Sequence, residues 1–213
     1  MIVALDLESP AAARGLVEQL GDSASFYKVG LELYSASGME FVRELKAVGK
    51  RVFLDLKLYD IGETVKRAVA QVALAGADFL SVHGSLAVMQ AAVAGKNEAG
   101  KGDAPLKLLA ITVLTSFDES DLKQLGYPCS VRELVELRVR NAMDAGIDGV
   151  VCSPLEVAGV RAIAGPKAIL VTPGVRSAGA GLGDQKRVAT PAEAIANGIL
   201  FGDGPPNHAR PES

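Results

Sequence analysis

The chain has 213 residues, of which 49% are hydrophobic, and its formal net charge at pH 7 is −3. These values are typical of one globular domain with a sizeable core and exclude a disordered chain. Lys and Arg are scattered among the acids, so nothing predicts binding to nucleic acid or to a membrane surface. Without a signal peptide or an apolar run of ~20 residues, we expect a cytoplasmic protein.

Apolar, β-branched runs that predict strands alternate with patterns that predict helices. In chain order, strands are expected at residues 2–5, 26–29, 51–56, 79–82, 107–113, 149–152 and 168–171. Helices are expected between and after them, at residues 10–20, 39–48, 61–75, 85–94, 131–145, 154–163 and 192–196. Ser9 suits the N-cap of the first helix and Pro10 its first turn.

This alternation predicts parallel strands joined by right-handed crossovers, and the uniformly apolar strands indicate a sheet buried on both faces. Polar residues cluster where the strands end, at Asp6, Lys28, Asp55, Lys57, His83, Thr115, Ser153 and Thr172. Barrels carry their chemistry at that end, whereas an open doubly wound sheet would more typically have a Gly-rich turn after its first strand. The predicted fold class is therefore α/β, a (β/α)8 TIM barrel.

The eighth strand is the main anomaly of the chain. Only Ile199-Leu200-Phe201 qualifies, and GDGPPNHARPES follows it. Pro205 and Pro206 cannot donate to a strand ladder. We therefore predict an eighth strand that is truncated or replaced, at most a short strand at residues 199–201, with irregular chain from about Asp203. The expected division is a barrel domain at residues 1–198 and an aberrant tail at residues 199–213.

The segment FLDLKLYDIGETV at residues 53–65 is the strongest functional signal. Side chains two apart in a strand face the same way, so Asp55 and Lys57 should share one face. Buried charges are costly unless they pair. With Asp6 and Lys28 on neighbouring strands, they predict an alternating chain of charges that holds each side chain in place, as catalysis requires. The alternative is an ion pair that only stabilises the barrel mouth.

Other polar residues have competing interpretations. Asp60 with Glu63 three residues later resembles a capping box, a role compatible with catalysis. His83 is expected to be a hydrogen-bonded structural residue and not a base. Cys129 and Cys152 are expected to be reduced, structural thiols. No cluster of His, Cys and carboxylates predicts a metal site.

Two segments after the seventh strand predict an anion site. TPGVR at residues 172–176 supplies Arg176, and GDQKR at residues 183–187 follows it. Glycines let backbone amides approach an anion, Arg suits phosphate, and barrels commonly bind phosphate after strands seven and eight. A flexible surface loop is the alternative.

Together these segments resemble orotidine 5′-monophosphate decarboxylases of the bacterial type. The matching segments are IVALD at 2–6, FYKVG at 26–30, FLDLKLYDIGETV at 53–65, ITVLTS at 111–116, VTPGVR at 171–176 and GDQKRVATPAEAI at 183–195. The resemblance spans residues 2 to about 198. Near the central motif, the family often has His, Pro and Asn where this chain has Tyr59, Gly62 and Glu63.

The resemblance implies conversion of orotidine monophosphate to UMP in pyrimidine biosynthesis, with no metal or cofactor, by a homodimer. Lys57 would donate a proton to C6, Asp55 would lie beside the departing carboxylate, and Asp60 would reach into the partner's site. The remaining implied contacts are Asp6, Lys28 and Thr64 near the ribose, Thr115 at the pyrimidine, and Arg176 and Gln185 at the phosphate.

The tail departs from this family, whose eighth strand continues with a Gly-Arg that grips the phosphate. Codons allowed for the tail, read one nucleotide later, can encode Ser-Tyr-Leu-Val-Met-Gly-Arg-Pro-Ile-Thr. We therefore hypothesise a frameshift or a sequencing error near Gly198, which the gene's nucleotide sequence would test. Two alternatives stay open: a magnesium-dependent sugar-phosphate decarboxylase or synthase of the same superfamily, and a frameshifted chain with impaired or no activity.

Overall fold

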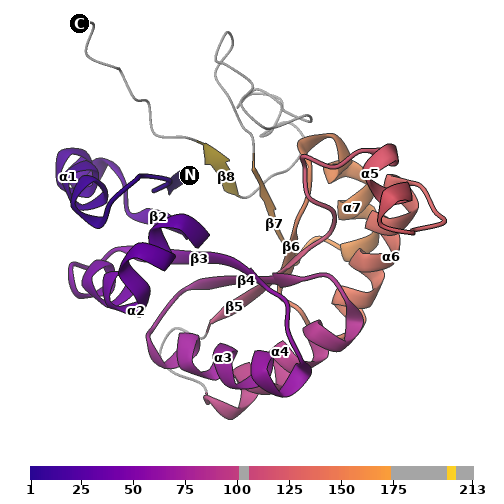
Figure 1. Cartoon of the computed structure of the whole chain (residues 1–213), viewed down its shortest axis with the longest axis horizontal. Helices are drawn as coiled ribbons and strands as arrows, with labels where there is room; N and C mark the ends of the chain where they lie inside the picture. Colours follow the sequence, from indigo (N-terminus) through magenta and orange to yellow (C-terminus); the bar gives the residue numbers. More distant parts are fainter. Residues whose placement is uncertain (101–105, 174–200, 205–213) are drawn as a thin grey trace, which may run out of the picture.

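The computed structural model of the chain describes residues 1–100, 106–173 and 201–204. Its strands are all parallel, pair in sequence order and close into a barrel (Figure 1). They are β1 (Ile2–Ala4), β2 (Phe26–Gly30), β3 (Arg51–Leu58), β4 (Phe79–His83), β5 (Lys107–Ile111), β6 (Gly149–Val151), β7 (Ile169–Thr172) and β8 (Phe201–Gly204). The barrel predicted from the alternation of strands and helices is confirmed.

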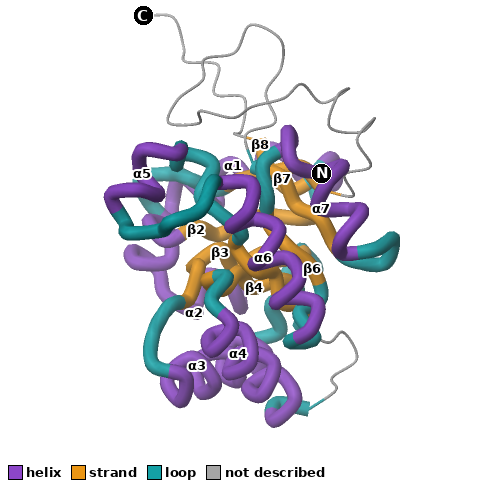
Figure 2. The backbone as a smooth tube through the Cα atoms, turned by 90° about the vertical axis from the view of Figure 1, so that its right-hand side faces the viewer, coloured by secondary structure: helices purple, strands orange, loops and turns teal. Residues whose placement is uncertain are grey.

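Helices surround the strands on the outside of the barrel (Figures 1 and 2). They are α1 (Pro10–Leu20), α2 (Leu31–Ala47), α3 (Gly62–Leu74), α4 (Leu86–Glu98), α5 (Glu119–Gln124), α6 (Val131–Asp144) and α7 (Val157–Ala164), with short 3-10 turns at Gly21–Ser23 and Pro154–Glu156. The predicted cap of α1 is confirmed, because the Ser9 side chain accepts a hydrogen bond from the Ala12 N–H and Pro10 opens the helix. The helix predicted at residues 192–196 lies outside the described residues.

Two helical segments differ from expectation. Helix α2 begins at Leu31 instead of residue 39, and it contains Gly38 with φ 62°, a left-handed backbone that glycine adopts without a steric penalty. Two helical runs therefore follow one another across a kink, and the prediction captured only the second. Helix α5 is absent from the prediction. It is short, and the Asp118 and Asp121 side chains that form its capping box read as ordinary loop residues.

The barrel interior begins with a hydrophobic layer from successive strands. Its buried members are Ile2, Phe26, Phe53, Phe79, Leu109 and Val171. The Phe79 ring meets those of Phe26 and Phe53 edge to face, with centroids 5.1 Å and 6.1 Å apart. Because side chains alternate along a strand, residues two positions further on point into the same interior, one layer closer to the carboxyl ends.

Helices α3 and α4 pack side by side on the outside of the barrel (Figure 2). Gly95 on α4 permits this close approach, because a Cβ atom there would lie 2.1 Å from the Lys66 backbone oxygen on α3. No side-chain rotation can relieve a clash with backbone, so a larger residue at Gly95 would push the two helices apart.

We expect Gly95→Ala to lower the free energy of unfolding by about 1–3 kcal/mol through overpacking. Gly15→Ala is the matched control, since Gly15 also lies within a helix but a Cβ atom added there would have nothing within 4 Å. There the change should stabilise the protein by up to about 1 kcal/mol, because alanine favours the helix. Urea unfolding of both variants checks this expectation, and equal effects would contradict the packing argument.

Strand β8 confirms a short eighth strand but not its predicted position. It runs from Phe201 to Gly204, pairs with β7 through Val171↔Phe201, and pairs with β1 through Ile2↔Asp203. The expectation that the chain is irregular from Asp203 is wrong at Asp203 and Gly204. Gly and Asp have poor strand propensity, yet both retain the backbone N–H that a ladder needs. Of the tail predicted at residues 199–213, residues 199–200 and 205–213 lie outside the described residues.

Candidate active site

A row of four charged side chains lies at the mouth of the barrel. Lys28 Nζ is 2.9 Å from Asp6 Oδ1 and 3.9 Å from Asp55 Oδ2, and Lys57 Nζ is 2.8 Å from the same Asp55 oxygen. The signs alternate along the row, so each charge faces an opposite one. The arrangement predicted from Asp6, Lys28, Asp55 and Lys57 is therefore present in the structure.

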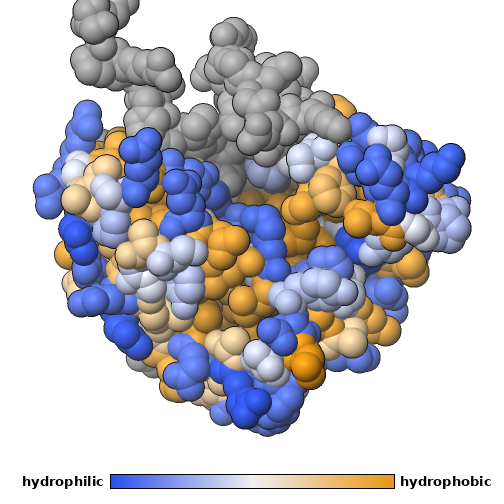
Figure 3. Space-filling model, viewed as in Figure 1, coloured by the Kyte–Doolittle hydropathy of each residue, from blue (hydrophilic) through white to orange (hydrophobic). Residues whose placement is uncertain are grey.

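The row lies directly above the hydrophobic layer. Lys28 follows Phe26 by two residues and Asp55 follows Phe53 by two, so the alternation of β2 and β3 carries both side chains inward. Their side chains are 7% and 12% exposed, whereas that of Lys57 is 43% exposed. Asp6, at the other end of the row, is 55% exposed, so both ends of the row are open to solvent and its two middle members are buried. Figure 3 shows hydrophilic side chains gathered in a recess of this face, with hydrophobic ones around it.

Glycine at the end of β2 makes room for the row. A Cβ atom on Gly30 would lie 2.8 Å from Asp6 Oδ1 and 3.5 Å from Lys28 Nζ. Any larger residue would crowd the carboxylate that partners Lys28. The FYKVG segment thus supplies both the buried ammonium and the space beside it.

Strand β3 reaches the site through an irregular backbone. Its pairing with β4 runs from Leu54↔Leu80 to Leu58↔Val82, so residues 55–57 bulge out of the regular register. Within the bulge, Lys57 has φ 51°, the left-handed region that a non-glycine residue occupies at a cost of about 1–2 kcal/mol. The predicted contact between Lys57 and Asp55 forms, but simple strand alternation is not its cause.

Asp60 lies apart from the row. Its side chain is exposed and accepts a hydrogen bond of 2.6 Å from the Ile61 N–H. The predicted capping box is wrong, because α3 begins at Gly62 and Ile61 is its N-cap, which leaves Asp60 one residue too early. Glu63 instead lies 3.7 Å from Arg67 one turn later. A carboxylate presented to solvent in this way remains available to a second chain.

The other predicted contact residues are distributed unevenly. Thr64 is exposed on α3, and no hydrogen bond joins its side chain to the charged row within the described residues. Thr115 is buried in the loop after β5. Arg176 and Gln185, the predicted phosphate contacts, lie outside the described residues.

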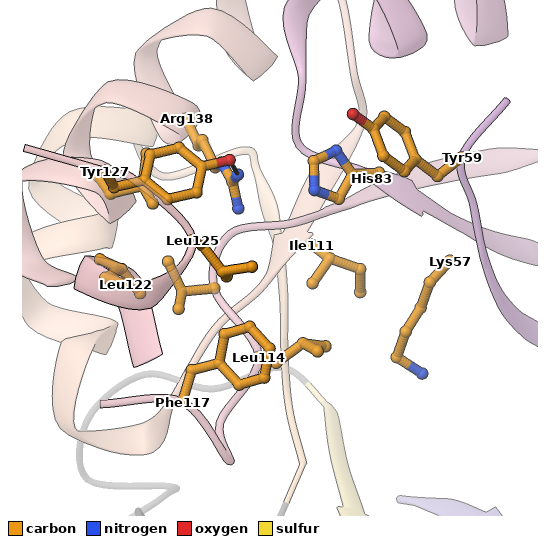
Figure 4. A pocket seen from close by; sticks show the side chains of 12 residues that line it. Lys57, Tyr59, His83, Ile111, Leu114, Phe117, Leu122, Leu125, Tyr127 and Arg138 are labelled. Carbon is orange, nitrogen blue, oxygen red and sulfur yellow. Dashed lines mark hydrogen bonds between the residues drawn. The ribbon is translucent and has the colours of Figure 1, made fainter. Parts of the chain in front are cut away.

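A pocket of about 230 Å³ opens beside Lys57 toward the loop that follows β5 (Figure 4). Its walls are mostly apolar and include Ile111, Val113, Leu114, Phe117, Leu122, Leu125 and Leu134. Its polar lining consists of Lys57, Tyr59, His83, Tyr127 and Arg138. Sequence reasoning overlooked Tyr127 and Arg138, which come from the loop and from α6. The Arg138 guanidinium donates to the Thr112 carbonyl and, over 2.9 Å, to Tyr127 Oη, which ties this loop to the barrel.

His83 is held in a structural setting, as the sequence predicted. Its Nδ1 accepts a hydrogen bond of 3.2 Å from the Ser85 N–H, and its ring lies against Tyr59 with centroids 4.2 Å apart (Figure 4). Burial, and secondarily the positive charge of Arg138, lower the pKa of His83 to about 4. The imidazole is therefore neutral near pH 7 and adds no charge to the pocket.

Ser81 on β4 is a further polar residue of the site that sequence reasoning missed. Its hydroxyl donates to Asp55 Oδ1 over 2.6 Å and accepts the Lys57 backbone N–H over 2.9 Å. The parity of β4 could have revealed it, since Ser81 follows Phe79 by two positions just as Asp55 follows Phe53.

Three further findings concern residues 1–100, 106–173 and 201–204. No group of three or more His, Cys, Asp or Glu residues there could hold a metal ion. No helix in this part of the chain has the length and apolar character needed to span a membrane. Cys129 and Cys152 form no disulfide, and Cys152 is buried in the core.

The sequence and the fold both match known proteins. The family described as "Orotidine 5'-phosphate decarboxylase / HUMPS family" matches residues 1–201. An orotidine 5'-phosphate decarboxylase of Rhodopseudomonas palustris is 54% identical over 198 residues, 93% of this chain and 82% of the relative. One of Nitrobacter winogradskyi is 53% identical over 201 residues, 94% of this chain and 82% of the relative.

A solved structure also resembles this chain. The crystal structure of the orotidine 5'-phosphate decarboxylase from Lactobacillus acidophilus has a TM-score of 0.83 and 33% sequence identity, and the match covers 96% of this chain and 89% of the other. With family similarity across residues 1–201 and close relatives over nearly the whole length, the chain belongs to the orotidine 5'-phosphate decarboxylase / HUMPS family.

Proposed function

We propose that this protein removes the carboxyl group of orotidine 5′-monophosphate as CO2 and yields UMP, a step of pyrimidine biosynthesis in the cytoplasm, without a metal or cofactor. The observation that carries the proposal is the row of Asp6, Lys28, Asp55 and Lys57 at the mouth of the barrel. Relatives that share about half of the sequence are named for this reaction, which supports a nucleotide over a sugar-phosphate substrate.

Lys57 is the residue that we assign to the chemistry. When the bond between C6 and the carboxyl carbon breaks, its electron pair remains on C6. A cation about 4 Å away, in a protein-like dielectric, stabilises that charge by about 4 kcal/mol. The Lys57 ammonium then donates its proton to C6. Its exposed position at the end of the row lets it face the substrate, while Asp55 holds Nζ at 2.8 Å.

The other residues are assigned to binding. Asp55 lies beside the departing carboxylate, and the remaining contacts are Asp6, Lys28 and Thr64 near the ribose, Thr115 at the pyrimidine, and Arg176 and Gln185 at the phosphate. Contacts to the remote phosphate supply binding energy that helps to stabilise the transition state.

The direct test is turnover of orotidine monophosphate by the purified chain, followed by loss of the orotate absorbance and by chromatographic detection of UMP. We expect UMP to form at the same rate with and without excess EDTA. A folded protein that produces no UMP at high substrate concentration would refute the proposal. Turnover that EDTA stops and magnesium restores would point instead to the metal-dependent branch of the superfamily.

We also propose that the active form is a homodimer in which Asp60 enters the partner's site. Asp60 lies between Tyr59 and Ile61, whose large apolar side chains are 70% and 77% exposed in the single chain. Covering each of them would contribute about 1.5–3 kcal/mol, so a partner surface here is favourable. The carboxylate between them would be carried into the interface with them.

A mixture of two inactive variants tests the shared site. Asp60→Ala and Lys57→Ala should each be inactive alone. After subunit exchange, half of the dimers combine both chains, and one of their two sites contains both residues, so about a quarter of the wild-type activity should return. If exchange is verified with tagged subunits and no activity returns, Asp60 does not act across the interface.

A further inference from the structure

Ser81 on β4 lies next to Asp55 and Lys57 of the neighbouring strand β3. Its side chain is fully buried, with an exposed fraction of 0%. It follows Phe79 by two positions and so belongs to the same interior layer as Asp55 and Lys28. The segment FLSVH that contains Ser81 is otherwise an ordinary buried strand.

The Ser81 hydroxyl makes two hydrogen bonds of opposite direction. A backbone N–H can only donate, so the Ser81 oxygen accepts from Lys57 N over 2.9 Å. The single hydroxyl proton is then free to donate to Asp55 Oδ1 over 2.6 Å, a distance typical of a bond to a carboxylate. The hydroxyl therefore acts as an acceptor for Lys57 and as a donor to Asp55, the two residues at one end of the charged row.

These bonds act on different degrees of freedom. Within the bulge, Lys57 has a left-handed backbone, and its N–H bonds to the Ser81 side chain rather than to a ladder carbonyl. A strained conformation of this kind persists when its surroundings fix it. At Asp55, the hydrogen bond from the Ser81 hydroxyl to Oδ1 sets the rotation of the carboxylate. This rotation turns Oδ2 toward Lys57 and Lys28.

We propose that Ser81 is a positioning residue, which holds the left-handed backbone of Lys57 and the carboxylate rotation of Asp55 and so fixes the Lys57 ammonium at the reacting carbon. This role rests on the proposed decarboxylation. Because the Ser81 side chain is fully buried, we assign it no contact with the substrate, and its removal should weaken the chemical step far more than substrate binding.

Three variants of Ser81 test the role. Ser81→Ala removes both bonds, Ser81→Cys keeps nearly the same volume but is a weak hydrogen-bonding group, and Ser81→Thr retains the hydroxyl. We expect kcat to fall roughly 10- to 100-fold in the Ala and Cys variants, with KM changed less than about threefold, and to recover to within about threefold in the Thr variant. Ser85→Ala is the control, because the Ser85 hydroxyl makes no hydrogen bond to a described residue.

Each outcome has one meaning. Ala and Cys variants with wild-type kcat overturn the positioning role while leaving the proposed function intact. A fall in kcat that the Thr variant fails to recover, or an equal rise in KM, also overturns it. An inactive but folded wild type refutes the proposed function, and the positioning role with it. If the Ala variant does not fold, kcat of the nearly isosteric Cys variant decides whether Ser81 is a positioning residue. Thermal unfolding checks that the Cys variant is folded.

Discussion

Replacing Lys57 with alanine is expected to lower turnover of orotidine monophosphate by at least about 10³-fold while the barrel stays folded. The change removes the ammonium that we propose to stabilise the carbanion and to protonate it. Because the Lys57 side chain is 43% exposed, its ion pair with Asp55 contributes little to stability. The free energy of unfolding should therefore change by less than about 1 kcal/mol.

Lys167→Ala is the matched control for this experiment. Lys167 is exposed and precedes β7 at the amino end of the barrel, opposite the charged row. The same loss of a lysine charge at that end should leave kcat and KM unchanged. Steady-state kinetics and urea unfolding of both variants give the two readouts. Equal activity of Lys57→Ala and the wild type would remove Lys57 from its assigned role.

The sequence predicts the charged row because barrel topology converts a one-dimensional pattern into a cluster. Parallel strands all end at the same rim, so polar residues at their carboxyl ends must meet there. Asp6, Lys28 and Asp55 meet in this way, and the row forms as expected. No side-chain detail is needed for that step, only the parity of each strand and the direction of the chain.

The bulge of β3 marks the limit of that reasoning. Strand alternation puts Lys57 on the face of Asp55, but the left-handed backbone at Lys57 interrupts the alternation. The long, flexible lysine side chain still reaches Asp55, so the predicted contact is correct for an incomplete reason. A bulge depends on what the neighbouring strand offers, here the hydroxyl of Ser81, and such a cross-strand partner is not visible in a local pattern.

Chain ends and helix starts are harder to predict for a related reason. The start of α3 differs by one residue from the predicted capping box, and that shift changes the partner of Asp60. Strand β8 forms from FGDG, in which only Phe201 favours a strand, because both neighbouring strands present ladder partners. Tertiary context decides both cases.

At the amino end of the barrel, two carboxylates join strands in the same way. Asp78 precedes β4 and accepts the Val52 N–H of β3, and Asp148 precedes β6 and accepts the Leu108 N–H of β5. Each also pairs with a lysine from an earlier helix. Asp78 Oδ2 lies 2.7 Å from Lys46 Nζ of α2, and Asp148 pairs with Lys96 of α4. The related segments AGADF and AGIDG precede these strands, a short repeat whose role becomes clear only from these contacts.

We expect Asp148→Ala to lower the free energy of unfolding by about 3 kcal/mol at pH 7, because it breaks a partly buried charge network. The Asp148 carboxylate lies 2.6 Å from Lys96 Nζ and 3.1 Å from Lys107 Nζ and also accepts the Leu108 N–H. Asp144→Ala is the control, since Asp144 is exposed at the end of α6. Urea unfolding of both variants measures the difference, and a loss below about 1 kcal/mol for Asp148→Ala would contradict the network's role.

The pH dependence of the free energy of unfolding, measured for the wild type and for Asp148→Ala, identifies the cause of that loss. Burial by itself would raise the pKa of Asp148, but the hydrogen bonds from Lys96, the Leu108 N–H and Lys107, with the Lys96 charge, outweigh it and lower the pKa from 3.8. A lowered pKa in the folded state means that the stabilisation is complete well above pH 3.8 and is lost as the pH falls through the folded value. The difference in free energy of unfolding between the wild type and Asp148→Ala should therefore be constant near neutral pH and become smaller in acid. If this difference in free energy stays constant into strong acid, packing, and not the charge of the carboxylate, joins β5 to β6.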